Sequence, residues 1–120
     1  MAKVLIIDDS PTEMQILTKI MEENGYDVFT AENGESGIVA AKKVQPDVVL
    51  MDVVMPGMNG FQATRQLSKD AKTAHIPVII ITTKDQETDR IWGMRQGAKD
   101  FLTKPVQNTK LLTAVRNLVA

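Results

Sequence analysis

The chain has 120 residues, contains no cysteine and carries a formal net charge of −1 at pH 7. This length is typical of one domain, and an apolar content of 43% is enough for a single core. The absence of cysteine excludes disulfides and thiolate metal sites, and the balanced charge argues against direct nucleic-acid binding. No apolar stretch approaches the roughly 18 to 20 residues of a membrane span and no signal peptide is visible, so the sequence predicts a cytoplasmic protein without membrane contact.

Short apolar segments alternate along the chain with longer stretches that have helical features. The segments are rich in Val and Ile and mostly continuous, which is typical of strands in a parallel sheet that is covered on both faces. They lie at Val4–Ile7, Val28–Thr30, Val48–Met51, Val78–Ile81 and Phe101–Leu102. We therefore predict one α/β domain over residues 1–120, with a five-stranded parallel sheet, doubly wound with right-handed crossovers into a (βα)5 sandwich.

The first predicted helix has clear start and stop signals. Ser10 is placed as the N-cap, Pro11 as the first helical residue and Glu13 three residues after the cap, which is the S-x-x-E pattern of a capping box. The pair Asn24-Gly25 is a typical helix stop. The pattern predicts that the Glu13 side chain bonds back to the backbone of Ser10.

Four more helices are expected, with Asp85 as the cap of the third of these and Asn108 as the cap of the last. Trp92, the only tryptophan, is either a core anchor or part of an exposed partner surface. The predicted ranges are Glu35–Val44, Phe61–Lys69, Gln86–Gln96 and Asn108 to Val119.

Polar residues follow the apolar runs at the points where the predicted strands end. They are Asp8 and Asp9, then Asp52, then Thr82 with Thr83, and finally Lys104. The carboxyl ends of parallel strands lie at one edge of a sheet, where open α/β sheets bind ligands. Taken singly, the Asp pair could cap a helix and the lysine could lie at the surface. Together they predict one shared site.

The charges at this edge need a counter-ion. Two unit charges about 4 Å apart repel by about 4 kcal/mol at an effective dielectric near 20. Asp8, Asp9 and Asp52 repel one another pairwise, and Lys104 offsets only part of their charge. Mg²⁺ prefers oxygen ligands of this kind. The sequence therefore predicts a divalent metal between the Asp pair and Asp52.

Several motifs together resemble the response-regulator receiver domain of two-component signalling. They are "LIIDDS", "DVVLMDVVMPGMNG", "VIIITT" and "AKDFLTKP", and the match extends over essentially the whole chain. The resemblance implies a flavodoxin-like, CheY-like fold with strand order 2-1-3-4-5. Longer segments such as "WGMRQGAKDFLTKPV" are similar to receivers of chemosensory pathways that control type IV pili.

The resemblance also implies a phosphorylation site with a metal. Asp52 would accept the phosphoryl group. Asp9 and Asp52 would bind Mg²⁺ directly, with Mn²⁺ as a possible substitute, and Asp8 would act mainly through water. The backbone carbonyl of Val54 would complete the protein ligands.

The remaining implied roles concern the phosphoryl group and a switch. Lys104 and Thr82 would contact the phosphoryl group, with Thr83 beside them. Thr82 and Phe101 would form the switch, in which the aromatic side chain fills space that the threonine vacates. The Lys104–Pro105 bond is a candidate cis peptide.

The implied partners are a histidine kinase of a chemosensory array and a downstream motility protein. The second partner would meet the face formed by the fourth helix, the fifth strand and the fifth helix. Because no output domain follows the predicted fifth helix, the output is expected in a separate protein, or the domain drains its kinase as a phosphate sink. We expect a monomer.

Three other readings of the sequence are weaker. A haloacid-dehalogenase type phosphatase needs an Asp two residues after its nucleophile, and this position is Val54. We therefore expect no turnover of an external substrate. A flavodoxin-like FMN carrier must hold a phosphate in its first loop, which Asp8 and Asp9 would repel. A protein-binding module that works without phosphorylation would not need all of the polar positions.

Overall fold

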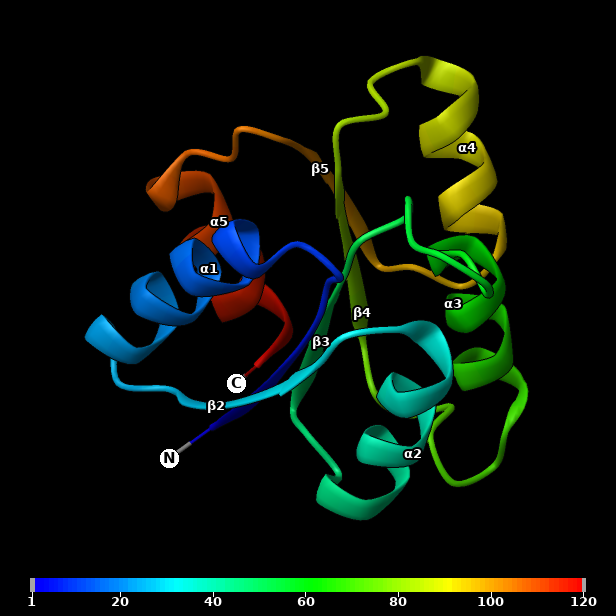
Figure 1. Ribbon diagram of the computed structural model, residues 1–120, viewed down its shortest axis with the longest axis horizontal. Coiled ribbons are helices and arrows are strands. Elements are labelled where there is room, and N and C mark those ends of the chain that lie inside the picture. The colour runs from blue at the N-terminus through cyan, green and yellow to red at the C-terminus, as the bar shows by residue number, and fades with distance from the viewer. Residues whose placement is uncertain (1, 120) are drawn as a thin grey trace.

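The computed structural model describes residues 2–119, and Met1 and Ala120, the ends of the predicted domain, lie outside the described residues. Strands and helices alternate five times (Figure 1). The strands are β1 (Lys3–Ile7), β2 (Asp27–Ala31), β3 (Val48–Met51), β4 (Val78–Thr82) and β5 (Asp100–Thr103). The helices are α1 (Pro11–Glu23), α2 (Gly34–Val44), α3 (Gly60–Lys69), α4 (Glu87–Arg95) and α5 (Asn108–Leu118). Among the described residues, no helix combines the length and apolarity that crossing a membrane requires.

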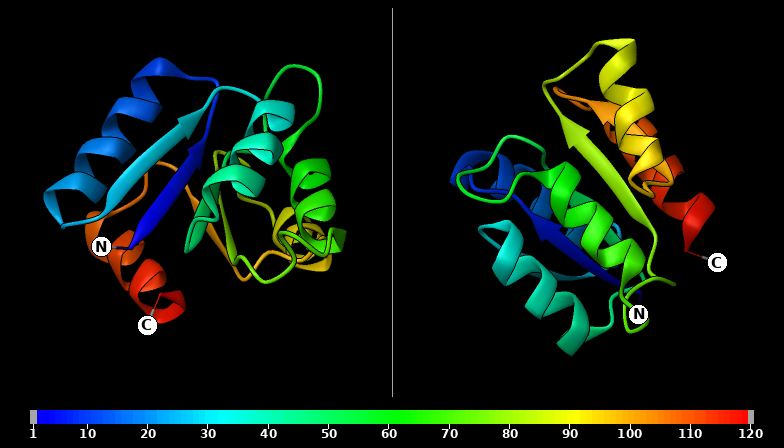
Figure 2. Two further views of the ribbon diagram at one scale, coloured as in Figure 1. Left: turned by 90° about the horizontal axis from the view of Figure 1, so that it is seen from below. Right: turned by 90° about the vertical axis from the view of Figure 1, so that its right-hand side faces the viewer.

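The five strands form one parallel sheet in the order β2-β1-β3-β4-β5, which confirms the predicted order. Helices α1 and α5 cover one face of the sheet, and α2, α3 and α4 cover the other (Figure 2). Two strands, β2 and β5, are one residue longer at each end than the sequence predicted, because their backbones continue to pair with the neighbouring strand. β2 pairs with β1 over its whole length, and β5 pairs with β4 from Asp100 to Thr103.

Strand β1, which pairs with β2 on one side and β3 on the other, shows why its sequence is continuously apolar. Val4 and Ile6 point to the layer of α1 and α5, whereas Leu5 and Ile7 point to the layer of α2 and α3. All four are fully buried. Successive side chains of a strand face opposite sides, so a strand with helices on both faces must be apolar at every position.

Two predicted helix caps were wrong. Asp85 was predicted as the cap of α4, but the cap is Gln86 and the helix begins one residue later. The Gln86 N–H donates to the Asp89 carboxylate at 3.3 Å, which fixes this start. Asn108 is already the first residue of α5, since the Leu111 N–H closes the first helical bond on the Gln107 carbonyl at 3.0 Å. By contrast, Ser10 accepts from the Glu13 N–H at 3.3 Å, as an N-cap should.

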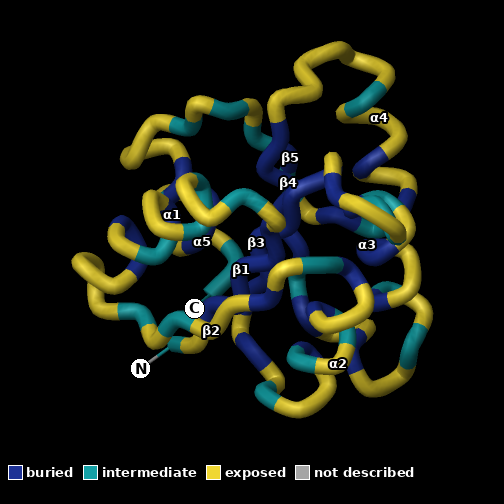
Figure 3. The backbone as a smooth tube through the Cα atoms, viewed as in Figure 1, coloured by how far each residue is buried: buried dark blue, intermediate teal, exposed yellow. Residues whose placement is uncertain are grey.

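Helix α4 buries fewer residues than the other helices, and most of its backbone is coloured as exposed in Figure 3. Gly93 is its only buried residue. Ile91 is 44% exposed and Trp92 is 50% exposed. Trp92 is therefore a surface residue, and the alternative of a core anchor is wrong.

Candidate functional site

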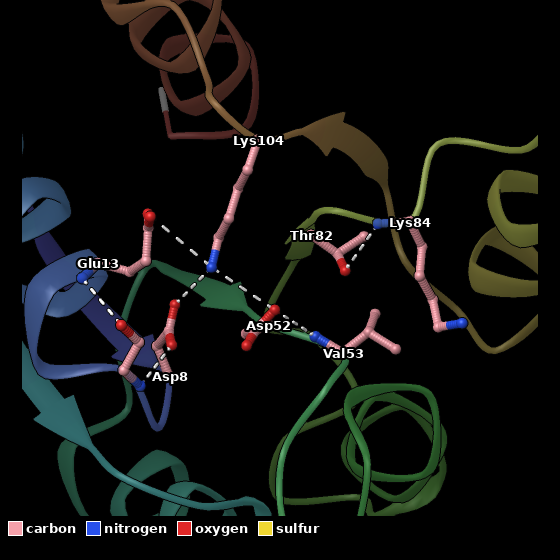
Figure 4. Close-up of polar contacts among 8 residues, drawn as sticks. Asp8, Glu13, Asp52, Val53, Thr82, Lys84 and Lys104 are labelled. Atoms are coloured by element: carbon pink, nitrogen blue, oxygen red, sulfur yellow. Dashed lines mark hydrogen bonds and ion pairs between the residues drawn. The ribbon is translucent and has the colours of Figure 1, made fainter.

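Three side chains from distant parts of the sequence meet at the carboxyl edge of the sheet (Figure 4). Asp8 follows β1, Asp52 follows β3 and Lys104 follows β5. The Lys104 Nζ lies 2.9 Å from Asp8 Oδ2 and 3.6 Å from Asp52 Oδ1. The parallel sheet brings them together because strands β1, β3 and β5 all end at this edge.

Asp8 is the most firmly held of the three. It is 2% exposed, and its two carboxylate oxygens have separate partners. Oδ1 accepts the backbone N–H of Ser10 at 2.9 Å, and Oδ2 accepts the Lys104 ammonium. These bonds fix the loop between β1 and α1 and orient the carboxylate toward the site.

Asp52 lies beside this pair with its charge partly uncompensated. Its Oδ1 accepts the N–H of Val53 at 2.9 Å. Burial raises the pKa of Asp52 to about 6, against the opposing effect of the Lys104 charge, and the neighbouring Asp8 charge raises it further. A carboxylate with this pKa is mostly ionised at neutral pH, but its negative charge is destabilised and favours binding of a cation or another electrophile.

Asp8, Asp9 and Asp52 fit a hard divalent cation. Each offers one carboxylate oxygen, and these oxygens all lie within 4.8 Å of one another. Asp9 is exposed, so the cluster opens to solvent on its side. Oxygen-only ligand sets of this charge suit Mg²⁺. Val54 is exposed in the loop after Asp52, and its carbonyl as a ligand stays a prediction.

Lys104 keeps its positive charge although its side chain is only 8% exposed. Burial disfavours the charged amine, but the hydrogen bond to Asp8 and the charge of Asp52 outweigh it and raise the pKa of Lys104 above its ordinary value. The Lys104–Pro105 peptide bond is cis.

The predicted switch residues lie on β4 and β5, next to the site. Thr82 is fully buried, and its hydroxyl accepts the backbone N–H of Lys84 at 3.3 Å. Thr83 is exposed. Phe101 is 7% exposed, and its ring packs in the core beneath α4, next to Gly93. The aromatic side chain is therefore directed inward in this structure.

Sequence reasoning missed one charged residue of this site. Glu13, predicted only as a capping residue, places its Oε2 at 4.0 Å from the Lys104 Nζ. A signal for it exists in the sequence, because Glu13 comes four residues after Asp9, in the first turn of the helix that begins at this edge. A carboxylate there faces the same edge of the sheet as the Asp pair.

The family model for the response regulator receiver domain matches residues 4–116. The chain belongs to this family. Protein PilH of Pseudomonas aeruginosa is 62% identical over 120 residues, covering 100% of this chain and 99% of that protein. The response regulator PleD of Caulobacter vibrioides is 42% identical over 117 residues, which are 98% of this chain but only 26% of PleD.

Solved structures of receiver domains share the fold. The chemotaxis protein CheY4 of Vibrio cholerae has a TM-score of 0.92 and 31% identity, with 98% of each chain covered. The receiver domain of the sensor histidine kinase PA1611 from P. aeruginosa has a TM-score of 0.91 and 24% identity, covering 98% of this chain and 97% of that one. That domain was solved with a magnesium ion coordinated in its active site cleft.

Proposed function

We propose that this receiver accepts a phosphoryl group on Asp52 from the phosphohistidine of a histidine kinase, in a Mg²⁺-dependent reaction. One observation carries the proposal: the Lys104 ammonium lies 3.6 Å from an Asp52 carboxylate oxygen, beside two further carboxylates able to hold a cation. Phosphoryl transfer needs positive charge around the transferred group, and this arrangement supplies it.

Asp52 is the nucleophile of the proposed reaction. Its carboxylate oxygen forms a bond to phosphorus, giving an acyl phosphate, while the bond from phosphorus to the imidazole nitrogen of the kinase histidine breaks. The leaving imidazole takes up a proton. The Val53 N–H holds Asp52 Oδ1, which fixes the direction of the carboxylate. Lys104 lies where it can stabilise the charge on the phosphoryl oxygens.

Asp8, Asp9 and Asp52, with the Val54 carbonyl, would hold Mg²⁺ or Mn²⁺ as the resident metal. When bound, the ion supplies positive charge that neutralises the phosphoryl oxygens. The acidic cluster supports this assignment, and so does the magnesium ion of the related PA1611 receiver. Without the ion, an incoming phosphoryl group would face three carboxylates.

Phosphorylation would act on the α4–β5–α5 surface through Thr82 and Phe101. The new oxygens would accept a hydrogen bond from the Thr82 O–H and so draw the hydroxyl away from the Lys84 N–H, which donates to it in this structure, with Thr83 beside it at the exposed rim. Movement of Thr82 would change the space beneath α4 that Phe101 fills. This is a shift of population between two packings, biased by contacts to the phosphoryl group.

The biological setting is part of the same proposal. The motif resemblance to receivers of chemosensory pathways, together with 62% identity to PilH and 31% identity to the chemotaxis protein CheY4, supports a chemosensory histidine kinase as phosphodonor. It also supports a motility protein, in twitching by type IV pili or in chemotaxis, as output. We propose that the protein acts in the cytoplasm as a monomer. We also propose that it turns over no external substrate, since Val54 stands where a phosphatase of the haloacid-dehalogenase type needs an Asp. The alternatives are a phosphate sink for the kinase and a binding module independent of phosphorylation.

Incubation with acetyl phosphate and Mg²⁺, followed by intact-mass measurement, tests the proposal. We expect the mass of one phosphoryl group to be added to the wild type, and to be absent in Asp52→Asn and when EDTA removes the metal. Asp27→Asn is the matched control, because Asp27 is an exposed carboxylate at the start of β2. A wild type that gains no mass with Mg²⁺ present contradicts the proposal.

A further inference from the structure

The Glu13 carboxylate is the outermost of three that surround the Lys104 ammonium. Its Oε2 lies 4.0 Å from Nζ, against 2.9 Å for Asp8 Oδ2 and 3.6 Å for Asp52 Oδ1. The Glu13 side chain is 37% exposed, whereas those of Asp8 and Asp52 are 1% and 9% exposed. Glu13 therefore contacts the ammonium from the solvent side of the site.

Glu13 is free to do this because the helix does not use its carboxylate. In a complete capping box, the Glu13 side chain would accept the N–H of Ser10. That N–H donates instead to Asp8 Oδ1 at 2.9 Å. The other half of the box is present, since Ser10 Oγ accepts the Glu13 N–H at 3.3 Å. Asp8 has thus taken over the capping bond, and the Glu13 carboxylate turns toward Lys104.

The direction of this contact matters for the proposed reaction. Figure 4 shows Glu13 and Asp52 on different sides of the ammonium, with Glu13 reaching it from α1. A phosphoryl group on Asp52 adds negative charge on the Asp52 side only. The Lys104 ammonium, which lies 3.6 Å from Asp52 Oδ1, is then attracted more strongly toward the Asp52 side and away from Glu13, because opposite charges at a few ångströms attract strongly.

We propose that Glu13 is a positioning residue that holds Lys104 toward α1 in the unphosphorylated protein and so opposes the contact of Lys104 with a phosphoryl group on Asp52. The proposal rests on the proposed role of Asp52 as acceptor. Glu13 stabilises only the position that Lys104 has in the unphosphorylated protein. Removing the Glu13 carboxylate therefore favours the phosphorylated state.

The first test compares Glu13→Gln with Glu35→Gln. Both remove one negative charge from the first turn of a helix, but Glu35 belongs to α2. Beryllofluoride, which mimics a phosphoryl group on a carboxylate, is titrated at saturating Mg²⁺. We expect it to bind about two- to five-fold more tightly to Glu13→Gln than to wild type, as for loss of a partly exposed ion pair. Glu35→Gln should bind it like wild type.

The second test needs neither metal nor phosphoryl chemistry. In EDTA, acetylation of the Lys104 amine by an N-hydroxysuccinimide ester is followed by peptide mass mapping. We expect Lys104 to react about two- to five-fold faster in Glu13→Gln, because one partner of the ammonium is gone, and at the wild-type rate in Glu35→Gln.

The outcomes separate the two proposals. If Glu13→Gln matches Glu35→Gln in both tests, Glu13 does not position Lys104, and a change in melting temperature alone would show a purely structural role. If the wild type binds no beryllofluoride, Asp52 is not the acceptor, and the acetylation rate still decides whether Glu13 restrains Lys104.

Discussion

The Asp8–Asp52–Lys104 site and helix α4 lie at neighbouring places in the fold, yet the protein holds them very differently. The three side chains of the site are each less than 10% exposed and are joined by ion pairs and backbone hydrogen bonds. α4 buries a single glycine and exposes Ile91 and Trp92. Regions with few buried contacts open and repack at low cost in free energy. The chemical site is therefore prebuilt, whereas the adjacent face is free to change.

Two glycines test this comparison with the largest expected effect. A Cβ on Gly60 would overlap the Asp52 carbonyl oxygen and lie 2.8 Å from the Val53 Cα, so backbone at the site must move. We expect Gly60→Ala to lower the free energy of unfolding by more than about 3 kcal/mol, measured by urea denaturation.

Gly93→Ala on α4 is the matched control. There the nearest atoms belong to side chains rather than to the backbone, Ile80 Cδ1 at 2.9 Å and Phe101 Cδ2 at 3.1 Å, and side chains shift more easily. A gain in helix propensity offsets part of the strain, so we expect a change within about 1 kcal/mol. Equal losses for Gly60→Ala and Gly93→Ala would show that the two regions are equally rigid.

Phe101→Ala separates the stability of the fold from the geometry of the site. Removing this buried ring leaves a cavity beneath α4, and we expect a loss of about 3 kcal/mol in the free energy of unfolding. Amide hydrogen exchange in α4 should become faster. Labelling of Asp52 by acetyl phosphate should persist, because Phe101 contacts none of the three site side chains through a hydrogen bond or ion pair in the described structure. Loss of labelling in a folded variant would contradict this separation.

The pH dependence of stability reports the buried charge of Asp52. Its pKa is raised from 3.8 to about 6 in the folded protein, so between these values the folded state binds more protons than the unfolded state. Stability must then fall as the pH rises from about 4 to about 6. After allowance for solvent screening we expect about 1 to 2 kcal/mol from this group in EDTA. Asp52→Asn should lack this part of the decrease. If the free energy of unfolding, measured by urea denaturation, fell equally with pH in both proteins, the pKa of Asp52 would not be raised by folding.

Trp92→Ala is expected to have the smallest effect. The side chain is 50% exposed on α4, so we expect a change in the free energy of unfolding below about 0.5 kcal/mol. Urea denaturation of the variant, followed by circular dichroism, measures it. A loss above about 2 kcal/mol would mean that α4 is packed more firmly than its exposure indicates, and would weaken the comparison with the site.

The fold and most of the site could be predicted from the sequence because each rests on a local pattern or on topology. Continuous apolar runs such as Val4–Ile7 require a sheet covered on both faces, and parallel strands bring Asp8, Asp52 and Lys104 to one edge. Helix caps were less secure. In α4 the Asp89 carboxylate accepts the Gln86 N–H, and the helix begins after Gln86 rather than after Asp85, which residue types alone did not distinguish.

The sequence by itself determined the order of strands and helices, the buried strands and the residue types at the edge of the sheet, because hydrophobic periodicity and chain direction act locally. Only the tertiary structure decided three further points: Trp92 is exposed, Asp52 has a pKa of about 6, and Glu13 turns from its helix cap to Lys104. Each depends on groups distant in sequence, since burial, charge and competing hydrogen bonds are set by what the fold places nearby.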